Sequence, residues 1–167
     1  MKHCAYCGTL FPLGNTWPKT CSGCGKITWR NPLPVAVLLV PVDIGGGKLR
    51  LVGIRRQNTV QSGHISPPGG FVTLGETWQE AAARETKEET NIAVDPRLIS
   101  PFDVRSTPDG VILIFGTIPC ITRGDLPVFV PNHEASERVL ISKSTRLAFP
   151  IHTAVVRNYL SLMEQYD

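Results

Sequence analysis

Four cysteines near the start of the chain form two pairs with the same internal spacing. Cys4 and Cys7 enclose two residues, as do Cys21 and Cys24, and a glycine follows each pair. Two C-x-x-C turns bring together the four thiolates that a tetrahedral structural zinc ion prefers. About 30 residues bury too little apolar surface to fold alone, so bound Zn²⁺ would supply the missing stability. We therefore expect a zinc ribbon over residues 1–32.

Disulfides and a redox C-x-x-C pair are the alternatives for these cysteines. Residues 1–8 contain two cysteines and a histidine where a secretory signal would need an apolar stretch, which argues against disulfides. A redox pair needs no duplicate, and four cysteines leave no open position for a catalytic zinc. Cys120 stands alone at the end of an apolar run, so we expect it to be a buried core thiol.

The charge is unevenly distributed along the chain. Residues 1–42 contain four basic residues and no acidic one, whereas residues 43–167 contain 13 basic and 14 acidic residues. This split favours two modules, the ribbon at 1–32 and a larger domain at 33–167. Four thiolates and one Zn²⁺ would lower the charge of the first segment from +4 to +2. The basic end is therefore a weak nucleic-acid footprint, and we expect no nucleic-acid partner.

No segment of the sequence is expected to span a membrane. The longest apolar runs, at 35–42 and 111–121, are shorter than the roughly 20 residues that a bilayer requires. With 42% apolar and 19% charged residues, the chain can bury a core. We expect a cytoplasmic protein.

The hydrophobic patterns predict an α/β fold with a mixed sheet. Residues 57–70 look like a loop, because they end in two prolines and two glycines. The predicted strands are 35–42, 48–55, 98–106, 111–121 and 138–141, and the predicted helices are 78–90 and 152–166.

The helix predicted at 78–90 carries the most informative side chains. A capping box starts it at Thr77. Glu85 and Glu89 lie four residues apart on one face, and Glu88 is about 60° away around the axis. Such like charges repel unless a divalent cation binds them, and hard oxygen ligands suit Mg²⁺ or Mn²⁺. Arg84 is spaced to pair with Glu88. A solvated acidic face is the alternative.

This helix and the turn before it resemble the Nudix box, G-x5-E-x7-R-E-U-x-E-E-x-G-U with U apolar. Thr86 replaces an apolar residue of the box and Asn91 replaces its last glycine. Asparagine suits a left-handed helix end, and Thr86 packs well only if its hydroxyl finds a backbone partner. The matching residues are Gly70, Glu76, Arg84, Glu85, Glu88, Glu89 and Ile92.

The resemblance, which covers residues 33–167, implies a Nudix hydrolase with an α/β/α sandwich fold. Such an enzyme cleaves the diphosphate of a nucleoside diphosphate linked to another group. Glu85, Glu88 and Glu89 are implied ligands of the catalytic Mg²⁺ or Mn²⁺, helped by the carbonyl of Gly70. Glu76 is expected to orient Arg84 or the loop.

The general base of the family often comes from a loop outside the box. Glu134 is the first candidate, ahead of Glu137, and His133 is a third option. A solvated loop carboxylate is the alternative for each. Phe149 and His152 are candidates to flank a base or ribose, with core packing as the alternative for Phe149. The candidates for substrate binding are Arg55, Arg56, Gly69 and Gly70.

A zinc ribbon followed by such a domain is similar to the NADH pyrophosphatase group and to a plant-type FAD/ADP-ribose pyrophosphatase group. The S-Q-P-W-P-F-P-x-S motif of the NADH enzymes is absent, and Pro108 stands where ADP-ribose enzymes tend to have a proline. We therefore expect a small nucleotide substrate of the ADP-ribose or FAD type rather than NADH. The alternatives are a nucleotide-sensing regulator whose ribbon binds nucleic acid or protein, and a housecleaning enzyme for modified nucleoside triphosphates. The family makes a homodimer plausible.

Overall fold

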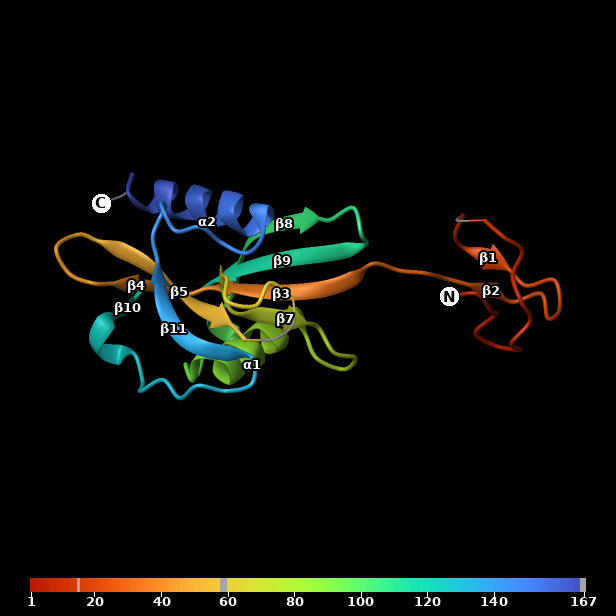
Figure 1. Ribbon diagram of the computed structural model, residues 1–167, viewed down its shortest axis with the longest axis horizontal. Coiled ribbons are helices and arrows are strands. Elements are labelled where there is room, and N and C mark those ends of the chain that lie inside the picture. The colour runs from red at the N-terminus through yellow and green to blue at the C-terminus, as the bar shows by residue number, and fades with distance from the viewer. Residues whose placement is uncertain (15, 58–59, 166–167) are drawn as a thin grey trace. The chain divides into compact units, whose positions relative to one another are not determined.

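The computed structural model describes residues 1–14, 16–57 and 60–165. The chain divides into two compact units, Met1–Pro32 and Leu33–Asp167. Figure 1 shows the elements of each unit. Among the described residues, no helix has the length and apolar character that crossing a bilayer demands.

The first unit consists of two similar cysteine-containing turns and a small hairpin. In the first turn the amide of Cys4 donates to the carbonyl of Thr9, and in the second the amide of Cys21 donates to Lys26 in the same way. β1 (Lys19–Thr20) and β2 (Ile27–Thr28) pair antiparallel. The buried apolar cluster of this unit is small and contains Cys4, Cys21 and Phe11. The backbone hydrogen bonds of the two turns thus hold the four cysteines close together.

The second unit contains two sheets. The four-stranded sheet has the order β7-β3-β9-β8, in which β3 and β9 are parallel. The other sheet has the order β10-β4-β5-β11, with β6 paired to β5. The strands are β3 (Leu33–Leu39), β4 (Pro41–Asp43), β5 (Leu49–Arg56), β6 (Ile65–Ser66), β7 (Gly69–Phe71), β8 (Ser100–Ser106), β9 (Val111–Thr117), β10 (Ile121–Thr122) and β11 (Ala135–Ile141).

Two of the predicted strands are each divided between these sheets. β3 ends at Leu39 and the chain continues in β4, while β9 ends at Thr117 and continues in β10. A proline stands at the break in both cases, Pro41 and Pro119. Because proline has no amide hydrogen, it interrupts a ladder and favours the change of sheet. β10 and β4 then pair in parallel, as β3 and β9 do before the break.

One helix packs on each side of the strands, which confirms the predicted α/β/α arrangement (Figure 1). α1 (Trp78–Thr90) buries Ala81, Ala82 and Ala83 in a cluster with Ala36 and Leu38 of β3. α2 (Pro150–Met163) packs its apolar face on the other cluster, with the alternate β3 residues Val37 and Leu39. The alternation along β3 therefore serves both helices.

Both ends of α1 follow the predictions. Thr77 and Glu80 form the capping box, and Asn91 ends the helix in the left-handed conformation at φ 64°. Thr86 differs from the expectation, because its side chain is fully buried and its Oγ1 has no hydrogen-bond partner among the described residues. A buried hydroxyl without a partner costs about 1 to 3 kcal/mol.

Three other details differ from the sequence predictions. The segment 57–70 contains β6 and the first two residues of β7, although residues 58–59 lie outside the described residues. The C-terminal helix spans Pro150–Met163 instead of 152–166, and Tyr166 is not described. The prediction of a buried Cys120 was wrong, because this residue is exposed. It follows Pro119, where the chain is passing between the sheets.

Candidate functional site

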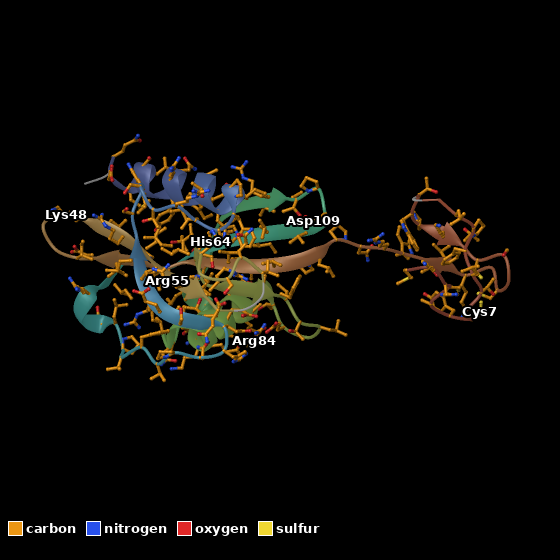
Figure 2. The ribbon with its side chains drawn as sticks, viewed as in Figure 1. Cys7, Lys48, Arg55, His64, Arg84 and Asp109 are labelled. Atoms are coloured by element: carbon orange, nitrogen blue, oxygen red, sulfur yellow. The ribbon has the colours of Figure 1, made fainter. Side chains whose placement is uncertain are left out.

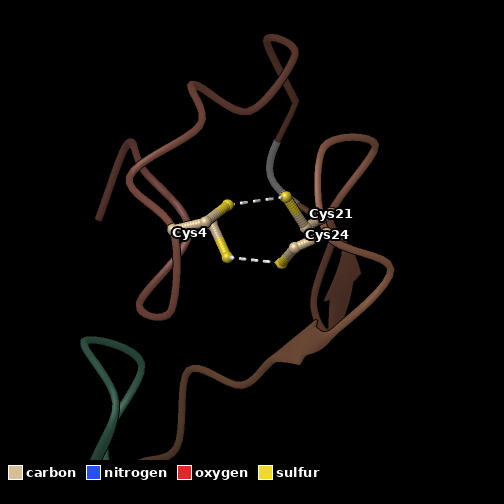
Figure 3. A group of neighbouring side chains, drawn as sticks. Cys4, Cys21 and Cys24 are labelled. Atoms are coloured by element: carbon tan, nitrogen blue, oxygen red, sulfur yellow. Dashed lines mark hydrogen bonds between the residues drawn. The ribbon is translucent and has the colours of Figure 1, made fainter.

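The four cysteines converge as their spacing predicts. Figure 3 shows Cys4 beside Cys24, with their Sγ atoms 3.7 Å apart, and the Sγ atoms of Cys7 and Cys21 are 3.5 Å apart. All four sulfurs lie within 4.8 Å of one another. A tetrahedral zinc ion with Zn–S bonds near 2.3 Å separates its sulfurs by about 3.8 Å, so the cluster has the right size for zinc.

Backbone amides donate hydrogen bonds to two of these sulfurs. The N–H of Tyr6 donates to Cys4 Sγ at 3.4 Å, and the N–H of Gly23 donates to Cys21 Sγ at 3.3 Å. The hydrogen bond from Tyr6 is the main reason that the pKa of Cys4 falls to about 6. A thiolate is the form that binds a metal, so this hydrogen bond favours metal binding by Cys4. The pKa of Cys24 is raised to about 12 instead, because the neighbouring sulfurs outweigh the backbone hydrogen bond of Lys26, and a bound cation would relieve that shift.

A second cluster forms in the larger unit, where three carboxylates meet. Oxygen atoms of Glu85, Glu88 and Glu134 all lie within 4.8 Å of one another. Glu85 and Glu88 come from α1, and Glu134 comes from the segment before β11. Oxygen donors at this spacing suit a hard divalent cation such as Mg²⁺ or Mn²⁺.

Arg84 holds the carboxylates of the box in place. Its Nη1 donates to Glu85 at 2.7 Å and to Glu88 at 3.2 Å. On its other side, Nε and Nη2 donate to the two oxygens of Glu76 at 3.1 and 2.8 Å, and Nη2 also reaches the carbonyl of Phe71. The bonds from Arg84 lower the pKa of Glu76 to about 2. Figure 2 labels Arg84, which lies on α1. Glu76 thus contacts Arg84 as the sequence suggests.

Two glycines of β7 allow the helix to approach closely. A Cβ atom on Gly70 would collide with the Glu85 carboxylate, so only glycine leaves room for that side chain. The amide of Gly69 donates to Oε2 of Glu89 at 2.9 Å. Glu89 is 3% exposed, and burial raises its pKa to about 8. Burial also raises the pKa of Glu85. A bound cation would relieve both shifts, which supports a metal site here.

Sequence reasoning did not assign a role to Asn132, which positions Glu134. Its Nδ2 donates to the carbonyl of Glu88 at 2.7 Å. Its Oδ1 accepts the amides of Glu134 and Ala135, both at 2.9 Å. The side chain therefore ties the loop to the end of α1. The available sequence signal was an asparagine two residues before the candidate base, because an asparagine side chain often hydrogen-bonds to the backbone two residues further along its own turn.

A cavity of about 740 Å³ extends from these carboxylates to the start of α2. Glu85, Glu89, Glu134 and Arg56 line its polar part. Arg56 also lies over the ring of Phe149, with its guanidinium carbon 5.5 Å from the ring centroid. The volume is typical of a pocket for a small molecule.

Several predicted residues lie outside the lining of this cavity. Arg55 donates to Glu137 at 2.9 Å and to the carbonyl of Gly63, so these two candidates pair with each other. His64, to which sequence reasoning assigned no role, contacts the carbonyl of Ser62. The side chain of His133 is 88% exposed, 3.6 Å from Glu134. Figure 2 labels Arg55 and His64. Of the two arginine candidates, Arg56 lines the cavity, and of the two glutamate candidates for the general base, Glu134 does.

A comparison with protein families matches residues 32–138 to the NUDIX domain. The chain belongs to the Nudix hydrolase family. The carboxylates on α1 and the glycines of β7 are thus its Nudix box in folded form. The matched span includes Asn132 and Glu134 but ends before α2.

Curated relatives belong to two groups. An ADP-ribose pyrophosphatase of Methanocaldococcus jannaschii is 33% identical over 115 residues, which is 66% of each chain. The NAD-capped RNA hydrolase NudC of Escherichia coli is 29% identical over 94 residues, covering 56% of this chain and 34% of that protein. The matches thus span about two thirds of the first relative and one third of the second.

Solved structures share the fold. The chain resembles a NUDIX hydrolase from Nitrosomonas europaea with a TM-score of 0.70 and 24% identity, covering 96% of this chain and 91% of that one. It also resembles the NUDIX domain of Shewanella oneidensis NrtR complexed with ADP ribose, with a TM-score of 0.62 and 16% identity, covering 79% and 90%. At these identities the likeness concerns the fold alone.

Proposed function

We propose that this protein is a metal-dependent pyrophosphohydrolase that cleaves ADP-ribose or FAD. The observation that carries the proposal is the cluster of Glu85, Glu88 and Glu134 beside a cavity that also contains Arg56. The likeness to an ADP-ribose pyrophosphatase supports the choice of substrate. The likeness to NudC and the cysteine cluster make NADH the alternative substrate.

Glu85 and Glu88, with Glu89 on the same helix, would hold Mg²⁺ or Mn²⁺. When bound, such an ion neutralises charge on a diphosphate and lowers the pKa of water. The four cysteines would hold Zn²⁺ in a closed structural site, which has no open position for a substrate.

The chain's own residues then have distinct roles in the hydrolysis. Arg56 is the guanidinium that binds the diphosphate, because it lines the cavity next to Glu89 and Glu134. Arg84 keeps Glu85 and Glu88 in position. Glu134 accepts the proton of the attacking water. A new O–P bond forms while the bridging P–O bond breaks, so that ADP-ribose yields AMP and ribose 5-phosphate.

Glu134 is chosen as the base because it differs from its neighbours. Glu85 and Glu88 are both bonded to Arg84, whereas Glu134 has no arginine partner among the described residues. Its side chain is 33% exposed, so water reaches it. A carboxylate with access to water and a fixed position is suited to proton transfer.

Hydrolysis assays with ADP-ribose, FAD, NADH and deoxynucleoside triphosphates in Mg²⁺ test the proposal. Turnover should be highest with ADP-ribose or FAD. Glu134→Gln should lower kcat by about 10² to 10⁴, the range for loss of a general base. Glu137→Gln is the matched comparison, because Glu137 is paired with Arg55 outside the cavity lining, and its effect should be below about threefold. No turnover with any of these compounds, together with tight nucleotide binding, would favour a sensing role instead.

A further inference from the structure

The loop that brings Glu134 to the site has little apolar packing of its own. It covers residues 126–134 and runs beside α1 to the start of β11 (Figure 1). Leu126 packs on the apolar cluster of α1, but Val128 and Val130 are 85% and 59% exposed. A segment with few buried apolar side chains is ordered mainly by its polar contacts. Those contacts therefore decide where Glu134 lies.

Arg138 joins this loop to the end of α1. It lies on β11 opposite Ile54 of β5, so the sheet holds its backbone in place. Its Nη1 donates to the carbonyl of Thr90 at 3.1 Å, and its Nη2 donates to the carbonyl of Pro127 at 2.6 Å. Its guanidinium carbon is 5.9 Å from the centroid of the Phe129 ring. One side chain thus contacts both the helix of the Nudix box and two residues of the loop.

The end of α1 provides a reason for an arginine at this position. The last carbonyls of a helix lack partners within it and carry partial negative charge. Thr90 is fully buried, so its carbonyl needs a donor from the protein. Burial lowers the pKa of Arg138, and no carboxylate among the described residues forms an ion pair with it. Its charge is therefore available to the helix end.

Two asparagines add contacts at the same end of α1. The Nδ2 of Asn91 donates to the carbonyl of Val128 at 3.4 Å, and the Nδ2 of Asn132 donates to the carbonyl of Glu88. Asn91 is the residue that replaces the last glycine of the box, and a glycine has no side chain to make this contact. The loop is thus bonded to the helix end at several points before Glu134.

We propose that Arg138 is a positioning residue for Glu134, because it fixes the loop on the end of α1 and so keeps this carboxylate beside Glu85 and Glu88. The inference rests on the proposed function, in which Glu134 is the general base. A misplacement of about 1 Å costs about 10² in rate, so loss of the two bonds should lower kcat. Arg138 lies outside the described lining of the cavity, so substrate binding should change little.

Hydrolysis of ADP-ribose by Arg138→Met in Mg²⁺ tests this role. Methionine removes both donors, so kcat should fall by about 10 to 10² while the KM stays within about twofold. Arg138→Lys keeps the charge and should recover part of the loss. Arg157→Met is the matched control, because Arg157 donates to the carbonyl of Lys143 outside the cavity lining. Equal kcat values in Arg138→Met and Arg157→Met, or a KM that rises as much as kcat falls, would overturn the proposal.

A double-mutant cycle shows whether Arg138 acts through Glu134. In the Glu134→Gln background the base is already lost, so Arg138→Met should lower kcat by less than about threefold. The same loss in both backgrounds would mean that Arg138 supports the fold without positioning the base.

Hydrogen exchange separates this inference from the proposed function. The amides of Glu134 and Ala135 donate to Asn132 and should exchange about tenfold faster in Arg138→Met. If the wild type hydrolyses ADP-ribose but kcat is the same in Arg138→Met, the positioning role is wrong and the proposed function stands. If the wild type hydrolyses none of the nucleotides but the exchange still accelerates, Arg138 fixes the loop and the proposed function fails. Unchanged exchange would contradict the positioning role in either case.

Discussion

The two clusters of ligand-forming residues are built in opposite ways. In the ribbon, Cys4, Cys7, Cys21 and Cys24 sit on two backbone turns, in a unit with a small apolar cluster. In the larger unit, Glu85 and Glu88 sit on a helix packed against β3, beside an open cavity. Soft thiolates that surround a centre suit a structural ion, and carboxylates beside a cavity suit a catalytic one. We therefore propose that the ribbon needs its metal to fold, whereas the larger unit needs its metal only to react.

The largest effect should come from breaking the ribbon site with Cys21→Ser. Structural zinc contributes about 10 to 16 kcal/mol in zinc-finger peptides, which exceeds what a unit this small gains from packing. We expect loss of zinc by metal analysis, and loss of dispersed amide NMR signals for residues 1–32. The melting transition of the larger unit should stay in place. A ribbon that keeps its dispersed signals without zinc would show that packing alone folds it.

Gly70→Ala should separate activity from stability in the larger unit. The new Cβ would displace the Glu85 carboxylate, which is the mobile end of a side chain, so the fold should tolerate it. We expect hydrolysis to fall by about 10² to 10³ because the metal ligand moves, with a melting temperature within about 2 °C. Gly124→Ala, where a Cβ meets nothing closer than 3.6 Å, is the control. Equal activity in the two variants would contradict the close approach of β7 and α1.

Acid should destabilise the larger unit through His152. Burial, followed by the nearby charge of Arg56, lowers its pKa to about 4 in the folded chain against 6.5 as its ordinary value, so the unfolded chain binds the proton more readily. The contribution of His152 to stability is therefore complete above pH 6.5 and falls as the pH drops toward 4, whereas the contribution of Glu89, whose pKa is raised to about 8, changes in the opposite direction and is common to both proteins compared below. One pKa unit is worth about 1.4 kcal/mol, so the loss by pH 5 is about 2 kcal/mol. Urea unfolding of the wild type and His152→Phe at pH 7 and pH 5 measures it. Equal losses in both proteins would exclude His152 as the cause.

The smallest effect concerns the departure of Thr86 from the Nudix pattern. Thr86→Val removes a buried hydroxyl without a partner and should stabilise the larger unit by about 1 kcal/mol. Thr90→Val is the matched control with the opposite expected sign, because the Thr90 hydroxyl donates to the carbonyl of Thr86 at 2.5 Å. That variant should be destabilised by about 1 kcal/mol. Denaturant midpoints of the two variants should therefore move in opposite directions, and a shift in the same direction would contradict the account.

The parts of the fold that follow local rules could be predicted. The capping box of Thr77 and the left-handed end at Asn91 depend on residues close in sequence, and the convergence of the cysteines follows from two C-x-x-C turns with the same spacing. The change of sheet after β3 and β9 could not be predicted. The residues before and after each proline are equally apolar, so the pattern does not show that they belong to different sheets. For the same reason the exposure of Cys120 was missed.

The part of the candidate site that lies on α1 could be predicted, because helical spacing fixes which side chains share a face. The separation of Arg55 from Arg56, and of Glu137 from Glu134, depends instead on the register of β11 against β5, in which Glu137 stands opposite Arg55. The contact of Asn132 with the end of α1 joins residues 44 positions apart, which no local pattern reveals. His152 and Phe149 were candidates from the sequence, but only the structure shows that both line the cavity and that their ring centroids are 5.0 Å apart.

Zinc content and hydrolysis, measured on the same sample of Glu85→Gln, show whether the two metal sites are separate. Glutamine keeps the size of the side chain but removes its charge. We expect Mg²⁺-dependent cleavage of ADP-ribose to fall by at least about 10³, the scale of a lost metal ligand or charge-stabilising group. We also expect one zinc ion per chain to remain in the ribbon. Retained hydrolysis, or zinc lost together with activity, would contradict the claim of two separate metal sites.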